Sequence, residues 1–287
     1  MNILYFIIII PIAILLYHNK NQQDEKMNSL RKHILLGNGK RKAVLIGATG
    51  ATGSQVLKIL LNSPEWGRVT TFGRRELPKT NNEDGKVDST EDTSKLQHHI
   101  VNFDTELNEN DDKIISLFKD HDVVFNCIGT TRGQAGGADP FYKIEVEYTQ
   151  KIATIASKAG IKHFSVVSAQ GANPNQYYVK WIHPLLYMYT LGMKEEVVKN
   201  VTPPFQRISI FRPGMLNRLK EDRTAEIIIN RVFGGLRVDA LAKCIVKDAE
   251  SDKHGSSNSV DDDTNTVVIE EPIIYEGNDV ILSQSQL

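Results

Sequence analysis

The chain has 287 residues and a mass of 32.2 kDa, with 40% hydrophobic and 24% charged residues. These proportions are those of an ordinary globular protein and exclude a disordered, collagen-like or disulfide-stapled chain. The formal net charge of −1 argues against a general nucleic-acid binder. Cys127 and Cys244 are too few for a disulfide framework, and the histidines show no metal-site spacing, so we expect free thiols and no bound metal.

The first 17 residues, MNILYFIIIIPIAILLY, carry no charge. As a helix they would span roughly 25 Å, which is the short end of what a bilayer requires. No basic residue precedes the segment and no small-residue cleavage site follows it, as a signal peptide would require. Four isoleucines before Pro11 also make a poor amphipathic face for a helix of a soluble domain. An uncleaved membrane anchor is therefore expected, with a signal peptide and a soluble-domain helix as alternatives.

Charged residues near the anchor predict its orientation. Basic residues follow the segment and none precede it, so the positive-inside rule places the rest of the chain in the cytosol. Residues 18–40 are polar and without clear period, and we interpret them as a tether. At the other end, residues 250–287 carry nine acidic side chains and one basic one. This acidity includes the low-complexity segment 249–265, which we expect to be disordered or a loop, and which would be a surface for protein partners if the protein is a scaffold.

From residue 41 onward, short apolar runs alternate with helical segments. Strands are expected at 43–50, 68–74, 98–103, 122–129, 163–171 and 207–214, and helices at 54–63, 110–120, 140–160, 183–200, 224–235 and 239–250. A polar insertion is expected at 78–95, and residues 266–283 suggest strands around a Gly-Asn turn. Short strands that are apolar on both faces and alternate with helices predict a doubly wound parallel sheet, a Rossmann-type α/β domain over 41–287.

The strongest motif is the glycine-rich run GATGATG at 47–53, which follows a predicted strand and opens a predicted helix. Gly47 allows a tight turn, Gly50 lets the backbone approach a pyrophosphate, and Gly53 lets the helix and strand pack closely. The N-terminus of the helix then faces the negative phosphates. In this context the motif predicts a dinucleotide site, although a glycine-rich turn without a ligand is the alternative.

The residues after the second strand indicate which dinucleotide is bound. An acidic residue there would bind the ribose hydroxyls of NAD, whereas this chain has Arg74 and Arg75, which suit a 2′-phosphate. NADP(H) is therefore the expected cofactor, and a solvated basic pair is the alternative. Asp104, after the third strand, is expected at the adenine amine or as a turn former. Residues 126–132 should pass the nicotinamide ribose.

Five stretches, GATGATG, TFGRREL, CIGTTRGQAG, KHFSVVSAQGAN and FRPGML, occur in this order along the chain. Together they resemble one group of atypical short-chain dehydrogenases/reductases, the family of the Tat-interacting oxidoreductase, with fungal relatives at mitochondrial and reticular membranes. The resemblance covers residues 43–249 and implies an NADP-binding Rossmann domain, reductase-type chemistry and a membrane or regulatory role. The expected cofactor-binding residues are Gly47, Thr49, Gly50, Ala51, Thr52, Gly53, Arg74, Arg75, Asp104, Gly129, Thr130, Lys194 and Pro213.

The resemblance also implies three catalytic residues. In such reductases a tyrosine passes the proton, and a lysine four residues later lowers the pKa of that tyrosine and holds the nicotinamide ribose. A serine at the end of the fifth strand orients the substrate carbonyl. Lys194 and Ser168 occupy the lysine and serine positions, but Thr190 stands four residues before Lys194, and the chain has no Tyr-x-x-x-Lys sequence.

Two tyrosines on the same predicted helix are candidates for the missing proton donor. Tyr189 is one residue out of phase with Lys194, and a one-residue bulge, for example near Gly192, would restore the pair. Tyr187 shares the face of Lys194 but lies two turns away. We take Tyr189, Lys194 and Ser168 as the expected catalytic set, with helix packing as the alternative role of both tyrosines.

These features predict a membrane-anchored, NADPH-dependent reductase of a carbonyl compound at the mitochondrial outer membrane or the endoplasmic reticulum. The intact cofactor loop beside an imperfect catalytic pair leaves two alternatives open. One is a non-enzymatic NADPH-binding regulatory or scaffold protein, and the other is a structural factor of a membrane complex.

Overall fold

The computed structural model describes residues 40–78, 92–217, 235–251 and 270–286. Several expected segments lie outside these residues: the membrane anchor, the tether as far as residue 39, all but the last residue of the helix expected at 224–235, and most of the polar insertion and of the acidic loop. Residues 41–287 cluster as one compact unit. Among the helices that the structure describes, none combines the length and apolarity needed to cross a membrane.

The centre of the unit is a parallel sheet of seven strands, in the order β3-β2-β1-β4-β5-β6-β9. The predicted doubly wound parallel sheet is therefore confirmed. The strand order reverses between β1 and β4, where such sheets bind ligands. The strands are β1 (Arg41–Ile46), β2 (Trp66–Gly73), β3 (Leu96–Ile100), β4 (Val123–Asn126), β5 (His163–Val167), β6 (Arg207–Arg212) and β9 (Ile273–Glu276), and a separate parallel pair joins β7 (Leu216–Asn217) to β8 (Leu236–Arg237).

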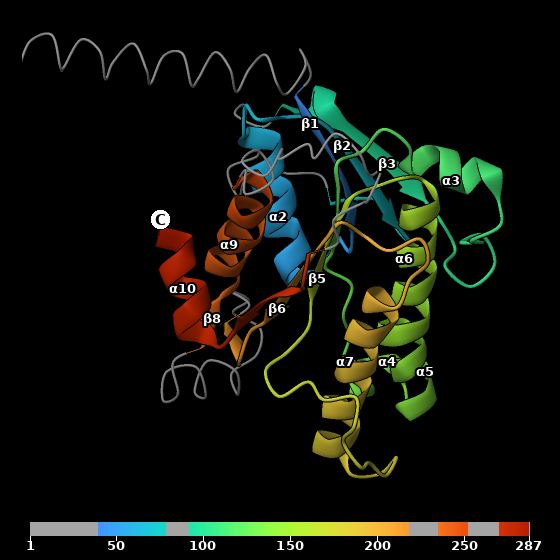
Figure 1. Ribbon diagram of the computed structural model, residues 1–287, viewed down its shortest axis with the longest axis vertical. Helices are drawn as coiled ribbons and strands as arrows, with labels where there is room; N and C mark the ends of the chain where they lie inside the picture. Colours follow the sequence, from blue (N-terminus) through green and yellow to red (C-terminus); the bar gives the residue numbers. More distant parts are fainter. Residues whose placement is uncertain (1–39, 79–91, 218–234, 252–269, 287) are drawn as a thin grey trace, which may run out of the picture. The chain divides into compact units, whose positions relative to one another are not determined.

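Helices cover both faces of the sheet (Figure 1). One face carries α2 (Ala51–Asn62), α9 (Val238–Glu250) and α10 (Asn278–Gln286), and the other carries α3 (Asp112–Phe118), α6 (Tyr148–Lys158) and α7 (His183–Lys199). Strand β1 shows why its sequence is a continuous apolar run. Val44 and Ile46 pack into the core under α6, whereas Ala43 and Leu45 pack into the core under α2 and α9, and all four are fully buried.

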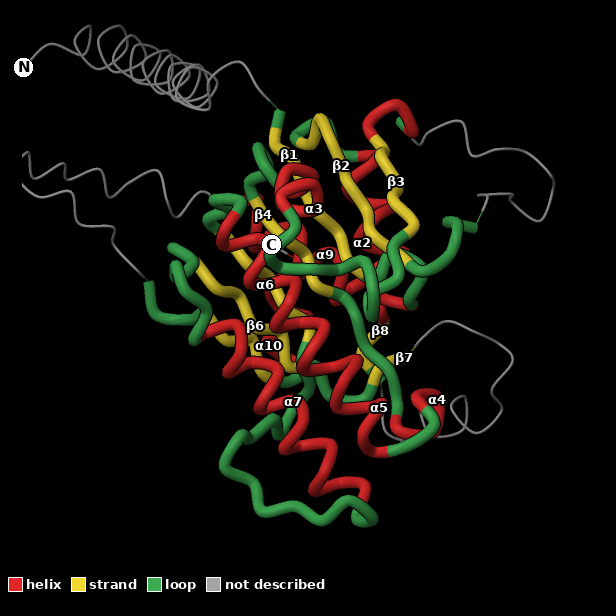
Figure 2. The backbone as a smooth tube through the Cα atoms, turned by 90° about the vertical axis from the view of Figure 1, so that its right-hand side faces the viewer, coloured by secondary structure: helices red, strands yellow, loops and turns green. Residues whose placement is uncertain are grey.

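The long helix predicted at 140–160 is interrupted. It runs through α5 (Ala138–Tyr142), a π-helical turn at Lys143–Glu147 called η2, and α6, and it follows the short helix α4 (Arg132–Ala135). The 3₁₀ turn η1 (Thr93–Lys95) precedes β3. Figures 1 and 2 show α5 and α7 extending together beyond the carboxyl ends of the strands.

The end of the chain differs from the prediction. Residues after the Gly277-Asn278 turn form the helix α10 and do not return as a strand. The Asn278 side chain accepts a hydrogen bond from the Gly214 backbone N–H at 2.9 Å, which holds this turn beside β6. Ile281 is fully buried in the core that includes α9. Burial against a neighbouring helix therefore outweighs the local hairpin preference of the sequence.

Candidate cofactor-binding site

A cavity of about 510 Å³ lies at the carboxyl ends of the central strands. Its walls come from the segments that follow β1, β2, β4 and β5, together with η2 and α7. Of the expected cofactor-binding residues, the structure brings these to the cavity wall: Gly47, Thr49, Gly50, Ala51, Thr52, Arg74, Arg75, Gly129, Thr130 and Lys194. Gly53, Asp104 and Pro213 are not among the lining residues, although Gly53 and Asp104 directly follow residues that are.

The glycine loop between β1 and α2 has no room for a side chain at Gly47 or Gly53. Gly47 has a φ of +84°, and a Cβ there would lie 2.8 Å from the Cys127 carbonyl carbon. A Cβ on Gly53 would lie 2.1 Å from the Gly47 carbonyl oxygen, so this glycine permits close packing of α2 on the loop. Gly50 caps α2 without a side-chain hydrogen bond and no acidic residue occupies the first turn, which suits this helix end to a negatively charged phosphate.

Arg74 and Arg75 are exposed at the end of β2, where they line the cavity. The His98 ring supports the turn that carries them. Its Nδ1 lies 2.7 Å from the Thr71 hydroxyl, and its Nε2 lies 3.0 Å from the Arg75 carbonyl oxygen. His98 also lines the cavity, and the sequence analysis missed it because nothing in the run of residues 96–100 marks it. Two guanidinium groups thus lie directly after β2, where Rossmann domains carry the residue that contacts the adenosine ribose of a dinucleotide.

Asp104 is not brought to the cavity. It accepts hydrogen bonds from the Lys143 ammonium at 2.6 Å and from the Tyr148 hydroxyl at 2.7 Å, and the bond from Lys143 is the main cause that lowers the pKa of this carboxyl. Phe103 and Tyr148 line the cavity in its place, with their rings edge to face at 5.4 Å. Burial raises the pKa of Tyr148 to about 12. Asp104 therefore contacts the cavity only through Tyr148, whose ring lines it.

Ser168 and Lys194 both line the cavity. Ser168 is 7% exposed, and its hydroxyl has no hydrogen-bond partner within the described part of the chain. A buried hydroxyl without a partner, on a residue that lines a cavity, is a candidate to bind a ligand atom. Lys194 is 1% exposed, and its ammonium donates to the Ile128 carbonyl at 2.7 Å and to Glu145 at 2.9 Å.

Glu145 is a site residue that the sequence analysis missed. It belongs to the π-helical turn η2, is 2% exposed and lines the cavity. One carboxylate oxygen accepts the Lys194 hydrogen bond, and the other accepts the Thr130 backbone N–H at 2.6 Å. A signal was present in the sequence, because an acidic residue interrupts the apolar face that includes Phe141, and a buried carboxylate requires a partner.

The two candidate tyrosines have different surroundings. Tyr187 lines the cavity, and its ring stacks with Phe141 and with His183, each at 5.9 Å between centroids. Tyr189 is not among the lining residues, and its ring stacks with Tyr178 at 4.0 Å and with Tyr142 at 6.5 Å. The structure therefore brings Lys194 and Ser168 to one cavity and leaves Tyr189 in an aromatic stack outside its walls.

The bulge expected near Gly192 is absent, because α7 is a regular α-helix from His183 to Lys199. Gly192 has a different role. A Cβ at this position would lie 2.2 Å from the Pro174 backbone nitrogen, so the glycine allows the loop after β5 to pass directly over the helix. The helix phase is consequently preserved, and Tyr189 and Lys194 stay on different faces.

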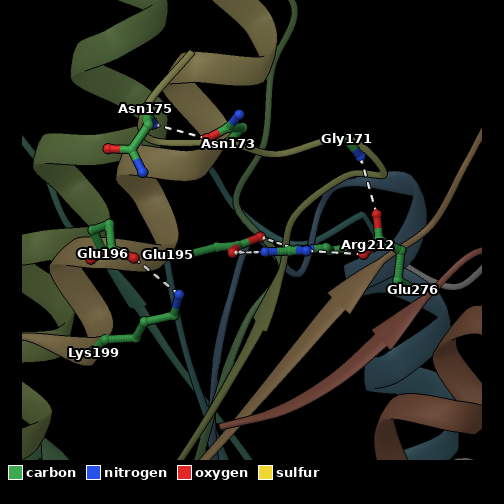
Figure 3. Close-up of polar contacts among 8 residues, drawn as sticks. All are labelled: Gly171, Asn173, Asn175, Glu195, Glu196, Lys199, Arg212 and Glu276. Carbon is green, nitrogen blue, oxygen red and sulfur yellow. Dashed lines mark hydrogen bonds and ion pairs between the residues drawn. The ribbon is translucent and has the colours of Figure 1, made fainter.

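Arg212 fixes α7 against the sheet (Figure 3). Its guanidinium donates two hydrogen bonds to Glu195, at 2.9 and 2.6 Å, and a third to Glu276 at 2.9 Å, and these acceptors raise the pKa of Arg212 further. Glu195 is fully buried and directly follows Lys194. The arginine of the FRPG sequence thus holds the helix turn that carries the lysine, and the neighbouring Pro213 carbonyl accepts the Gln170 N–H at 2.9 Å.

Within the described residues, the cavity wall carries neither a reactive thiolate nor a metal centre. Burial raises the pKa of the Cys127 thiol, at the cavity wall, to about 12, so the thiol stays protonated near neutral pH. Among the residues that the structure describes, no group of three or more His, Cys, Asp or Glu side chains is placed to hold a metal ion. The glycine cradle, the uncapped helix end and the arginine pair fit a dinucleotide instead.

Comparison with known proteins agrees with this geometry. Residues 47–247 match the family model described as NAD(P)H-binding. Protein HTATIP2 of Rattus norvegicus is 33% identical over 74% of this chain and 77% of its own length. Protein FMP52-1, mitochondrial, of Scheffersomyces stipitis is 33% identical over 68% of this chain and 74% of its own length.

Solved structures share the fold at low sequence identity. UDP-glucuronic acid 4-epimerase from Bacillus cereus, in complex with NAD, superimposes with a TM-score of 0.54 at 18% identity, covering 82% of this chain and 77% of the epimerase. MoeE5 in complex with UDP-glucose and NAD gives a TM-score of 0.55 at 14% identity, covering 85% and 80%. The chain thus carries an NAD(P)H-binding Rossmann domain and belongs to the family of atypical short-chain dehydrogenases/reductases that includes Protein HTATIP2 and the fungal FMP52 proteins.

Proposed function

We propose that this protein is an NADPH-dependent oxidoreductase that reduces a carbonyl compound. The observation that carries the proposal is the composition of one cavity, which is lined by the glycine loop, the arginine pair, Ser168 and Lys194. A phosphate cradle beside an unpartnered hydroxyl and a buried ammonium is an arrangement suited to hydride transfer. The family membership supports dinucleotide binding, and the reaction itself is our inference.

NADPH is proposed over NADH because of the charges at the end of β2. Arg74 and Arg75 line the cavity there, and Glu76, the next residue, is not among its lining residues. Guanidinium groups bind a phosphate dianion through charge-assisted hydrogen bonds, whereas the ribose hydroxyls of NADH would offer them no such partner. The arginines would therefore favour the phosphorylated cofactor.

The bound cofactor supplies the hydride, and the protein supplies position and a proton. Lys194 has three N–H donors, and two are already engaged by Ile128 and Glu145, which leaves one for a ribose hydroxyl. The Ser168 hydroxyl donates to the carbonyl oxygen of the substrate, which would give this buried group its missing partner. Lys194 is held in place by its two hydrogen bonds before the substrate binds.

Tyr187 is the proposed proton donor in place of Tyr189. The choice rests on its position in the cavity wall, whereas Tyr189 is stacked between Tyr178 and Tyr142. Desolvation also raises the pKa of Tyr189, which makes it a poorer proton shuttle near neutral pH. Two helical turns separate Tyr187 from Lys194, about 10 Å along the axis, so Tyr187 would act without direct help from the ammonium.

The uncharged segment 1–17 would anchor this domain to a membrane, and residues 18–40 would be its tether. Fungal relatives are named mitochondrial, which supports a mitochondrial membrane as the location, with the domain on the cytosolic side. An anchored reductase meets apolar compounds at the bilayer surface, so a lipid-derived carbonyl is the substrate class that we favour.

A non-enzymatic NADPH-binding regulatory protein is the second candidate function. It is favoured by Thr190, which stands four residues before Lys194 where the related reductases have the tyrosine, and by the position of Tyr189. Such a protein would bind the cofactor through the same cradle and present its acidic segment to protein partners.

One experiment separates the two candidates. NADPH binding to the 287-residue chain is measured by nicotinamide fluorescence, and oxidation is followed with a panel of apolar aldehydes and ketones. The Tyr187→Phe variant should bind NADPH as the unaltered chain does and lose most turnover, whereas Tyr189→Phe should keep both. Tight binding without turnover on any carbonyl would favour the regulatory protein, and a chain that does not bind NADPH would exclude both candidates.

A further inference from the structure

Three elements meet at the Glu145 carboxylate. Glu145 itself belongs to η2, Thr130 belongs to the loop after β4, and Lys194 belongs to α7. The side chains of Glu145 and Lys194 are 3% and 1% exposed, so water does not compete for these bonds. The carboxylate therefore links the two walls between which the nicotinamide end of a dinucleotide would lie.

The hydrogen-bond donors at this junction restrict which chemical group can lie between them. Thr130 N–H and the Lys194 ammonium are both donors, so the group between them must accept at both ends, as a carboxylate does. The second acceptor of Lys194, the Ile128 carbonyl, directs the ammonium from another side. With these two bonds made, the direction of the remaining Lys194 N–H is fixed by the protein alone.

We infer that Glu145 is a positioning residue for the cofactor, acting through Lys194. This inference rests on the proposed function, since it assumes that Lys194 binds the ribose of NADPH. Glu145 holds the ammonium in its binding direction before the nucleotide arrives, so binding does not have to order a flexible lysine. It also ties the Thr130 backbone to the same point, which keeps the loop and the lysine at a constant separation.

A π-helical turn at this place agrees with the assignment. The Tyr148 N–H bonds to the Lys143 carbonyl, five residues back, so the helix is widened around Glu145. Such turns are rare and occur often at functional sites, because they cost stability that a purely structural helix would keep. Here the wide turn carries the one buried carboxylate that faces the cavity among its described lining residues.

Glutamine cannot replace Glu145 without loss. Its amide has one acceptor oxygen, so either Thr130 N–H or the Lys194 ammonium would face an amide NH₂ group, which is also a donor. Aspartate keeps two acceptor oxygens on a side chain shorter by one methylene. We therefore expect Glu145→Gln to disturb the direction of Lys194, and Glu145→Asp to restore part of it.

The test is a double-mutant cycle on the dissociation constant of NADPH, measured by nicotinamide fluorescence with the 287-residue chain. Glu145→Gln should weaken binding about tenfold or more, the loss expected when one charge-assisted hydrogen bond is misplaced. In a Lys194→Met background, the same Glu145→Gln change should have little further effect, because the residue through which it acts is gone. Glu145→Asp should recover part of the affinity.

The outcomes separate this inference from the proposed function. If the unaltered chain does not bind NADPH, the proposed function fails. If the unaltered chain binds NADPH and the Glu145→Gln variant binds it equally well, the inference is wrong. The inference is also wrong if Glu145→Gln weakens NADPH binding by the same factor with and without Lys194, because Glu145 is then no more than a structural residue. Far-ultraviolet circular dichroism of each variant identifies loss of fold, and a Glu145→Asp variant that folds but recovers no affinity also counts against the inference.

Discussion

The buried pair of Lys194 and Glu145 provides a sharp test of how burial controls the strength of an ion pair. The change is Lys194→Met, which removes the ammonium and keeps most of the side-chain volume. It leaves Glu145, 2% exposed, with a single hydrogen bond from Thr130, and it leaves the Ile128 carbonyl without its lysine donor. A buried charge without its partner destabilises a protein by about 3–5 kcal/mol.

A surface pair offers a matched comparison. Lys180 and Asp139 lie 2.6 Å apart, closer than the 2.9 Å between Lys194 and Glu145, but their side chains are 65% and 79% exposed. Lys180→Met should change the free energy of unfolding by only about 0–1 kcal/mol, because exposed pairs are screened and lose side-chain entropy. If distance alone governed the interaction, the surface variant would be the more damaging of the two.

Urea denaturation followed by tryptophan fluorescence measures the free energy of unfolding of Lys194→Met, Lys180→Met, Glu145→Gln and the double variant Glu145→Gln/Lys194→Met. We expect the double variant to lose only about 1–2 kcal/mol, since it buries no unpaired charge. A double variant that loses as much as the two single changes combined would refute the coupling, and so would a Lys194→Met variant that is as stable as Lys180→Met.

Three further predictions concern the cofactor half of the site. Replacing Arg74 or Arg75 by Ala should weaken NADPH binding about tenfold each and leave NADH binding unchanged in fluorescence titrations. Tenfold is the lower end of the loss expected for a charged hydrogen bond, because both side chains are exposed. Gly53→Ala should lower the free energy of unfolding by about 3 kcal/mol and the melting temperature by roughly 6–12 °C, because the new Cβ would collide with the Gly47 carbonyl oxygen. The control variant Gly133→Ala, whose Cβ would have no atom within 4 Å, should not lower the melting temperature. Iodoacetamide should leave Cys127 unmodified at pH 7.5 in the folded chain, because its pKa is raised to about 12; rapid alkylation detected by mass spectrometry would contradict this.

The sequence predicted those parts of the molecule that depend on local patterns. The parallel sheet followed from short runs such as 43–46, apolar on both faces, and the turn after β1 followed from glycines whose steric requirement is local. The position of the arginine pair directly after β2 also followed from the local pattern, and its part in binding a 2′-phosphate stays a prediction. The helix α10 was missed because its formation depends on burial of Ile281 beside a distant helix, and a local pattern contains no such information.

The part of the site around Lys194 was harder to predict because it depends on contacts between segments far apart in sequence. Glu145 and Lys194 are 49 residues apart, and the sequence around either residue does not indicate that the other is its partner. The expected bulge in α7 required Gly192 to be a break in the helix, but its absent side chain makes room for the Pro174 backbone. A glycine in a helix is ambiguous from sequence alone, since a kink and a close contact select the same residue.

The regularity of α7 connects the fold to the choice between a reductase and a cofactor-binding regulator. Arg212 binds Glu195, and the loop at Pro174 passes over Gly192, so the helix is held on two sides next to Lys194. A helix fixed in this way cannot rotate by the amount needed to bring Tyr189 to the cavity without breaking the buried contacts of Glu195. The proton for any carbonyl reduction must then come from another group in the wall. Tyr187 is the tyrosine of α7 that the described cavity wall contains, and loss of turnover in Tyr187→Phe with unchanged NADPH binding is the result that this argument requires.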